Sequence, residues 1–163
     1  MEQRVLSTQM PTAIKDSKVD ITSERSTREL AEKLTSHFKG GEYIFLYGEM
    51  GVGKTTFVKY FINKFQTNEK LKLSEVTSPT FNLLNEYETN NFTIKHYDLF
   101  RIKSNLELKD LDIFENNEKT ITLVEWPQLL ENSNKTKSVD LIFFYENELK
   151  NRSVKIKGLK IFK

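Results

Sequence analysis

The strongest constraint in this sequence is a phosphate-loop pattern over residues 48–55, called the phosphate loop below. It reads GEMGVGKT and matches G-x-x-x-x-G-K-[ST] at every fixed position. From the chain's own Gly, Lys, Ser and Thr content, only about 0.004 chance matches are expected. The apolar, β-prone run Tyr43–Tyr47 precedes the loop, and an amphipathic stretch follows it. This order predicts an α/β P-loop NTPase fold, with a mixed, mostly parallel sheet flanked by helices.

The residue types of the phosphate loop explain which ligand it suits. Gly48, Gly51 and Gly53 allow the backbone N–H groups to turn inward and approach phosphate oxygens closely. The N-terminus of the following helix adds a positive dipole end at the same point. Lys54 supplies a mobile charge for the β- and γ-phosphates, and the Thr55 hydroxyl is an oxygen ligand for Mg²⁺. The loop therefore predicts a site for a nucleotide and magnesium.

Composition narrows the remaining function classes. The chain has 163 residues, a net charge of +2 and no cysteine. These values exclude disulfides and thiol chemistry, and they predict no strong general affinity for nucleic acid or membrane. No apolar run approaches the roughly 18 residues of a spanning helix, and the first residues lack the apolar core of a secretory signal. We expect a soluble, cytoplasmic protein.

The rest of the chain predicts one domain with alternating elements. Residues 1–18 read as a flexible extension, and residues 19–163 as a single P-loop domain. A helix capped by Ser26 or Thr27 is expected to end at Gly40-Gly41, and residues 66–75 read as a loop. Residues 104–114 predict a short helix opened by Ser104. Asn90-Asn91 suits a hairpin turn. Strands are expected at 19–22, 43–47, 81–87, 92–98, 120–125, 141–145 and 154–156.

Two predicted strands end in an acid. Asp98 follows IKHY, and Glu125 follows ITLV. In an open α/β sheet the ligand crevice lies outside such strand ends, so both carboxylates can reach a bound nucleotide. Either acid alone can equally well end a strand in solvent. Glu125 follows the more apolar strand and is the stronger metal ligand candidate, whereas Asp98 can position water.

Other scarce residues leave alternatives open. Thr80, in Ser78-Pro79-Thr80, suits a switch that senses the γ-phosphate, although the segment also reads as an ordinary turn. His96 is a base or a packing residue, and Trp126 is a core aromatic or a partner anchor. From residue 149 onward six cations occur without an acid. This basic segment either contacts RNA or protects an edge strand from aggregation.

Four ordered segments together resemble the TsaE family, the bacterial ATPases of tRNA threonylcarbamoyladenosine biosynthesis. They are LYGEMGVGKTTF at 46–57, VTSPTFNLLNEY at 76–87, HYDLFRI at 96–102 and LVEWPQ at 123–128. The first is shared by many nucleotide-binding families, whereas the other three are more specific. The resemblance covers about residues 19–157. It departs at Asn151, where glycine is common, and in the longer N-terminal extension.

The resemblance implies a cytoplasmic, magnesium-dependent ATPase that is slow alone and stimulated by partners. Its partners would be a threonylcarbamoyl transferase subunit and its inactive paralogue, of the TsaD and TsaB type. Hydrolysis would reset that complex, which modifies the adenosine at tRNA position 37, and contact with tRNA would be indirect. No membrane is involved.

The resemblance also assigns residues. Thr55 and Glu125 would hold magnesium, and Lys54, Thr80, Asp98 and Glu125 would serve hydrolysis. Trp126 would contact the partner. ATP would contact Thr27 near its base and Arg152 near the C-terminal end of the domain. Its phosphates would contact the loop residues Gly48, Glu49, Met50, Gly51, Val52, Gly53, Lys54, Thr55 and Thr56.

Two other classes remain open. A small-molecule or nucleotide kinase would use the same phosphate loop, but only Arg101 and Arg152 follow that loop and no lid insertion is evident. A nucleotide-gated binding module or a GTPase is the other class. The Asn-Lys-x-Asp guanine signature is absent, which favours adenine.

Overall fold

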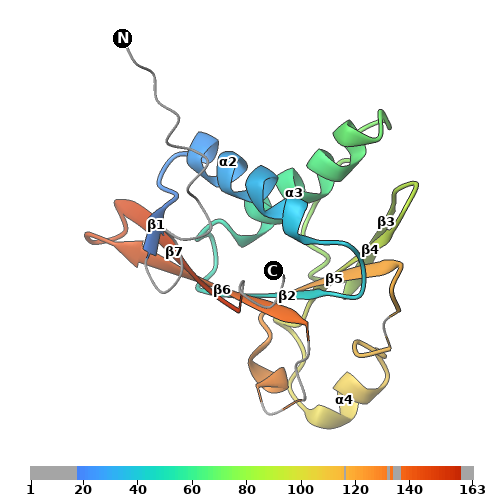
Figure 1. Cartoon of the computed structure of the whole chain (residues 1–163). Helices are drawn as coiled ribbons and strands as arrows, with labels where there is room; N and C mark the ends of the chain where they lie inside the picture. The colour runs from blue at the N-terminus through green and yellow to red at the C-terminus, as the bar shows by residue number, and fades with distance from the viewer. Residues whose placement is uncertain (1–17, 116, 132, 134–136, 159–163) are drawn as a thin grey trace.

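One mixed β-sheet organises the residues that this computed structural model describes, 18–115, 117–131, 133 and 137–158 (Figure 1). Its spatial order is β1-β7-β6-β2-β5-β4-β3. The central strands β6, β2, β5 and β4 are parallel, and the pairs β1–β7, β6–β7 and β3–β4 at the edges are antiparallel. The strands are β1 (Lys18–Asp20), β2 (Tyr43–Tyr47), β3 (Leu84–Glu88), β4 (Thr93–Asp98), β5 (Thr120–Glu125), β6 (Ser138–Glu146) and β7 (Asn151–Lys157).

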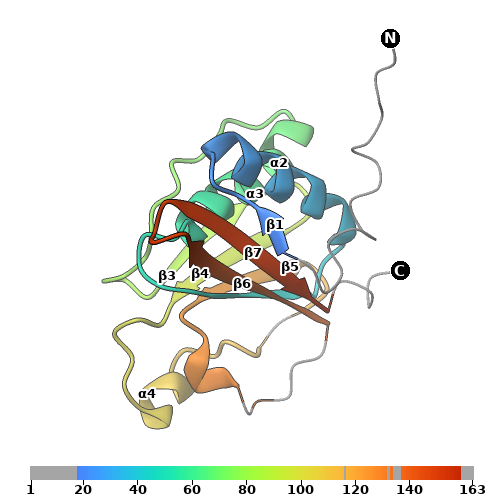
Figure 2. The ribbon, with the colours of Figure 1, turned by 90° about the vertical axis from the view of Figure 1, so that its left-hand side faces the viewer.

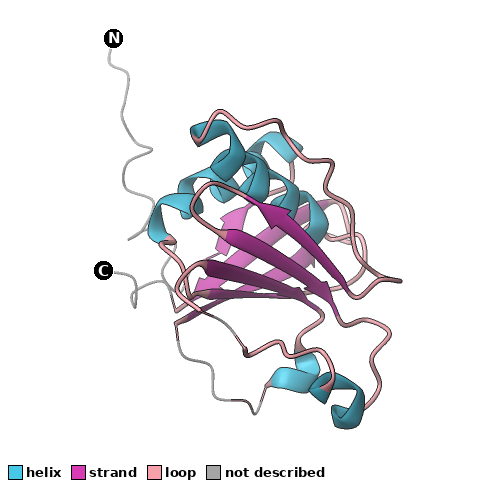
Figure 3. Cartoon of the chain, turned by 90° about the vertical axis from the view of Figure 1, so that its right-hand side faces the viewer, coloured by secondary structure: helices cyan, strands magenta, loops and turns pink. Residues whose placement is uncertain are grey.

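Helices lie on both sides of this sheet (Figure 3). The longer helices α2 (Glu24–Leu34) and α3 (Lys54–Asn68) cover one face. A 3-10 turn, η2 (Thr35–His37), directly follows α2. The short α4 (Asn105–Lys109) and η3 (Gln128–Leu130) lie on the other side. This arrangement confirms the predicted α/β fold with a mixed sheet flanked by helices.

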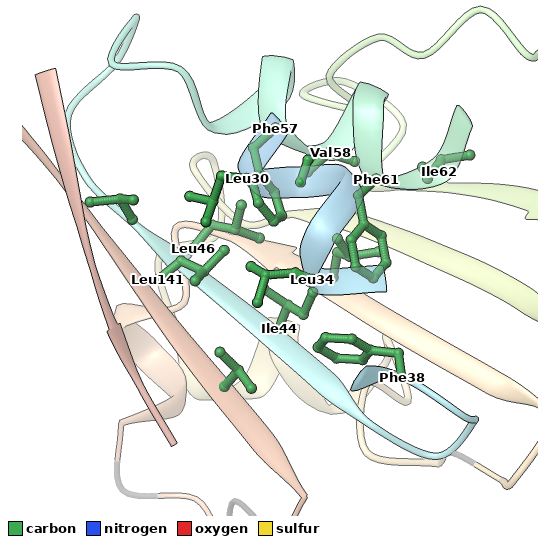
Figure 4. Close-up of a cluster of buried hydrophobic side chains, with 14 of the residues drawn as sticks. Leu30, Leu34, Phe38, Ile44, Leu46, Phe57, Val58, Phe61, Ile62 and Leu141 are labelled. Carbon is green, nitrogen blue, oxygen red and sulfur yellow. The ribbon is translucent and has the colours of Figure 1, made fainter. Parts of the chain in front are cut away.

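The central strand β2 is buried on both faces. Ile44 and Leu46 pack into the larger apolar cluster beneath α2 and α3, beside Phe57 and Phe61 (Figure 4). The alternate residue Phe45 packs into a second cluster on the opposite face. Because successive strand side chains point to opposite faces, a continuous apolar run is what a doubly covered strand requires. The prediction from Tyr43–Tyr47 is confirmed.

The start of α2 differs from the prediction. The N-cap is Ser23, whose Oγ accepts a hydrogen bond of 3.0 Å from the Ser26 backbone N–H. Thr27, the other predicted cap, is buried on the packing face of the helix. Leu34 is the last α-helical residue, so the helix ends before Gly40 and Gly41. The cap was misplaced because several hydroxyl residues precede this helix and only packing selects among them.

Other boundaries also moved. The strand predicted at 81–87 begins at Leu84, and Phe81 lies in a turn with 82% of its surface exposed. The first residues of the loop predicted at 66–75 belong to α3 instead, which extends to Asn68. Gln66 is buried there, and its side-chain oxygen accepts a hydrogen bond from the Ser74 backbone N–H. The strand at 120–125, the hairpin turn at 90–91 and the Ser104 cap are confirmed. The helix after Ser104 is shorter than predicted.

The basic strand β7 (Asn151–Lys157) does not form an edge of the sheet. It pairs with β6 on one side and with β1 on the other, so that Val19 lies opposite Val154 (Figure 2). The edge-strand interpretation of its lysines was therefore wrong. The predicted strand at 19–22 is Lys18–Asp20, and Lys18 belongs to the fold instead of the extension. The other residues of that predicted extension lie outside the described residues. Among the described helices, none has the length and apolar character needed to cross a membrane.

Candidate functional site

A cavity of about 310 Å³ opens where the phosphate loop leaves β2. In the sheet, Leu46 at the end of β2 lies opposite Glu125 at the end of β5, and Asp98 at the end of β4 also lies opposite Glu125. The carboxyl ends of three parallel strands therefore meet here, as expected for an α/β ligand crevice. The cavity is lined by Met50, Gly51, Gly53, Lys54, Thr55, Thr56, Ser78, Thr80, Asp98, Phe100, Glu125, Trp126 and Arg152.

Two glycines explain the path of the phosphate loop. Gly48 has φ +144°, and a Cβ at this position would lie 2.9 Å from Cβ of Phe143, so both backbone and space demand glycine. Gly53 caps α3 with φ +116°, and a Cβ there would meet nothing within 4 Å. At Gly53 the backbone conformation alone requires glycine. Val52 is buried in the core and anchors the loop beneath α3.

Lys54, the first residue of α3, directs its ammonium group back over the loop. Only 4% of the residue is exposed, and Nζ donates to the carbonyl oxygens of Gly48 and Glu49, the latter at 3.0 Å. Burial lowers the pKa of Lys54 below its ordinary value, partly offset by the nearby carboxylates of Glu125 and Asp98. A polyphosphate would offer this buried cation stronger acceptors than the two neutral carbonyls.

Glu125 joins two other elements at the floor of the cavity. Its Oε1 accepts a hydrogen bond of 2.9 Å from the Thr55 hydroxyl of α3 and lies 2.8 Å from Nε2 of His96 on β4. Only 3% of Glu125 is exposed, and His96 is fully buried. The carboxylate is therefore held between the helix that carries the phosphate loop and the neighbouring strand.

Asp98 organises the second side of the cavity. Its Oδ2 accepts hydrogen bonds from Ser78 Oγ at 2.6 Å and Thr80 Oγ1 at 3.3 Å, and its Oδ1 accepts the backbone N–H of Phe100 at 2.9 Å. An ionised carboxylate has about four lone-pair positions, so one remains for a further donor such as water. The Ser-Pro-Thr segment predicted as a switch is thus tied directly to this acid.

The donors around Thr55 fit a magnesium ion bound together with a nucleotide. Because the Thr55 hydroxyl donates its proton to Glu125, its lone pairs stay available to a cation. Within the described ranges no cluster of three His, Asp or Glu side chains could hold a metal by itself. Magnesium commonly takes only one or two protein ligands, completing its shell with phosphate oxygens and water. The residues present therefore suit magnesium carried in with phosphates.

Aromatic side chains form one wall of the cavity. The Trp126 ring lies with its centroid 4.2 Å from Lys54 Nζ and 4.9 Å from the Phe100 ring. Trp126 has φ +57°, a conformation that is uncommon outside glycine, and its backbone N–H bonds to the Leu46 carbonyl at 3.3 Å. Trp126 is half-buried. It is therefore a wall of the site, and its predicted contact with a partner stays a prediction.

The remaining predicted residues divide into two groups. Arg152 reaches the cavity, where its guanidinium donates to the Thr22 carbonyl at 2.7 Å. Thr27 does not line the cavity, because its buried hydroxyl bonds to the Ile21 carbonyl at 3.2 Å, and its contact with a nucleotide base stays a prediction. Gly48, Glu49 and Val52 form the loop but are also absent from the lining.

Sequence reasoning missed three contributions to the site. Ser78 makes the shorter bond to Asp98, although Thr80 was the residue selected from that motif. Phe100 was overlooked two residues beyond Asp98. For His96 a base and a packing residue were the alternatives, and neither predicted that the ring contacts Glu125. Only the alternation along β4, which puts residues 96 and 98 on one face, pointed to His96.

Comparisons with known proteins agree on one family. Residues 21–154 match the family model described as "Threonylcarbamoyl adenosine biosynthesis protein TsaE". Two similar curated proteins, from Aquifex aeolicus and Rickettsia felis, are each named tRNA threonylcarbamoyladenosine biosynthesis protein TsaE. That of Aquifex aeolicus is 40% identical over 68% of this chain and 76% of its own length. That of Rickettsia felis is 37% identical over 68% of this chain. The match spans 63% of that relative's own length, which is less than two thirds.

A solved structure shows the same fold. The crystal structure of Bacillus subtilis YdiB matches 84% of this chain and 81% of its own chain, with a TM-score of 0.60 and 24% sequence identity. At this identity the likeness concerns the fold alone.

Proposed function

Because the chain belongs to the TsaE family of threonylcarbamoyl adenosine biosynthesis proteins, we propose that it binds and hydrolyses ATP with Mg²⁺ in support of that tRNA modification. One observation carries the proposal. Lys54, Thr55, Asp98 and Glu125, which come from one helix and two strands, meet at a single cavity beside the phosphate loop. A cation, a hydroxyl and two acids in this arrangement suit phosphoryl transfer to water.

Each group has a distinct part in the proposed reaction. Phosphoryl transfer to water depends mainly on positioning and charge stabilisation, which magnesium, when bound, supplies at the phosphate oxygens. Lys54 exchanges its loop carbonyls for the β- and γ-phosphates. Thr55 and Glu125 hold the metal. Asp98, with its free lone-pair position, orients the attacking water, and Thr80 places a hydroxyl beside it.

The proposed partners are the transferase subunit and its inactive paralogue, of the TsaD and TsaB type. ATP turnover resets their complex, and the isolated chain turns ATP over slowly. Contact with tRNA is indirect, because this chain carries a net charge of only +2.

The test is co-purification of the full chain with that transferase pair, followed by a nucleoside assay for threonylcarbamoyladenosine. Multiple-turnover product should require this chain, ATP and Mg²⁺ together. Product that forms equally well without the chain would contradict the proposal. Transfer of phosphate to a small-molecule acceptor, in place of water, would instead identify a kinase.

Trp126 provides a separate prediction about the partner. Trp126→Ala should weaken complex formation at least tenfold, since a central aromatic anchor typically contributes about 2 kcal/mol or more to an interface. The matched control is Phe114→Ala, because Phe114 is also a part-exposed aromatic (41%) but does not line this cavity. Affinity is measured by titrating the labelled transferase pair. Equal affinities for wild type and Trp126→Ala would contradict the partner role of Trp126.

A further inference from the structure

His96 is a buried polar side chain that the proposed reaction does not use. It lies on β4 with no exposed surface, two residues before Asp98 and on the same face of the sheet. Its register partner on β5 is Leu123, two residues before Glu125. The ring therefore lies behind the carboxylate, on the side away from bulk solvent.

The hydrogen bonds define the role available to this ring. Nε2 lies 2.8 Å from Glu125 Oε1, and Nδ1 is buried without a hydrogen-bond partner among the described residues. An ionised carboxylate can only accept, so Nε2 carries the proton and donates. The geometry therefore makes Nε2 the donor in the contact with Glu125.

The same carboxylate oxygen receives a second donor from another element of the fold. Thr55 Oγ1 donates to Glu125 Oε1 at 2.9 Å, so this oxygen is clamped between α3 and β4. Two donors on one oxygen restrain the position of that oxygen and so limit the movement of the carboxylate. Such outer contacts orient the direct ligands in metal sites, where their removal typically costs about 10- to 100-fold in metal affinity or activity.

We propose that His96 is a positioning residue, which holds Glu125 in the orientation needed for magnesium and thereby couples metal binding to nucleotide binding. The proposal rests on the proposed ATP and magnesium site. It assigns His96 no contact with nucleotide and no proton transfer in the reaction.

Three variants of the full chain separate donation from packing. In glutamine the amide nitrogen is as many bonds from Cα as Nε2 is in histidine, so His96→Gln keeps the donor. In His96→Asn the amide nitrogen is one bond closer, at the Nδ1 position, and cannot reach Glu125 in the same way. His96→Leu removes the donor altogether.

The readout is the affinity for a non-hydrolysable ATP analogue, measured by calorimetry in EDTA and in Mg²⁺. The ratio of the two dissociation constants is the metal coupling. It should fall about 10- to 100-fold in His96→Leu and His96→Asn, and His96→Gln should restore most of it. The affinity in EDTA should change less than about threefold, since His96 does not line the cavity.

A second measurement needs no ligand. Long-range ¹H–¹⁵N spectra of the metal-free protein should show His96 protonated at Nε2, with His37→Gln used for assignment. A ring without a proton at Nε2 would overturn the proposal.

Other outcomes are equally decisive. Unchanged coupling in His96→Leu and His96→Asn, or loss of the fold in both amide variants, would show that the ring serves packing alone. Wild-type protein whose analogue affinity does not respond to Mg²⁺ would refute the proposed function instead, while the spectra still report on the hydrogen bond to Glu125.

Discussion

Lys54→Ala is expected to abolish measurable ATP turnover and to weaken binding of an ATP analogue roughly 30- to 5,000-fold. Lys54 is the cation of the phosphate loop, and its ammonium is held inside the cavity by two carbonyl oxygens that phosphates would replace. Removing one partner of a buried, hydrogen-bonded charge pair costs about 2–5 kcal/mol, which corresponds to this range of affinity. Equilibrium dialysis of the analogue and a phosphate-release assay measure the two effects.

A matched control for this variant is Lys64→Ala. Lys64 lies on the same helix but does not line the cavity. Its affinity for the analogue and its turnover should match wild type. The fold of Lys54→Ala should survive, because the change removes a charge whose burial is unfavourable. Wild-type turnover by a folded Lys54→Ala protein would show that the phosphate loop is not the active site.

Glu125→Gln is expected to reduce magnesium-dependent hydrolysis by about 100-fold or more. The substitution keeps the shape of the side chain but removes the negative charge that faces the Thr55 hydroxyl. Binding of an ATP analogue in EDTA should be unchanged or tighter, because a carboxylate near polyphosphate is repulsive without the metal. Phosphate release over a series of Mg²⁺ concentrations is the measurement, and exposed Glu131→Gln is the control.

The comparison with Asp98→Asn decides which acid is the principal metal ligand. The structure favours Glu125, because it contacts Thr55, whereas Asp98 is bound by Ser78, Thr80 and the backbone of Phe100. Asp98→Asn should therefore slow hydrolysis while the analogue still binds more tightly with Mg²⁺. If the metal dependence is lost in Asp98→Asn and kept in Glu125→Gln, the two assignments must be exchanged.

The sequence predicted the central strands of the sheet better than it predicted the helix caps and the strands near the sheet edge. β2 and β5 were predicted with the bounds that the structure shows, because both segments are rich in the apolar and β-branched residues typical of strands covered on both faces. The Ser23 cap was missed because neighbouring hydroxyl residues are locally equivalent. β7 was misassigned to an edge because the short β1 has too little pattern of its own to reveal its pairing with β7.

The sequence by itself determined the phosphate loop, the strand before it and the helix after it, since these depend on residues adjacent in the chain. It also named both acids, but not their partners. Only the tertiary structure decided that Thr55 and His96 meet at Glu125, and that Ser78 bonds to Asp98. Those contacts join residues 20, 29 and 70 positions apart, and they depend on strand register and on how α3 and the segment before β3 lie against the sheet. Local patterns do not encode such pairings, because they are fixed by the packing of the whole sheet.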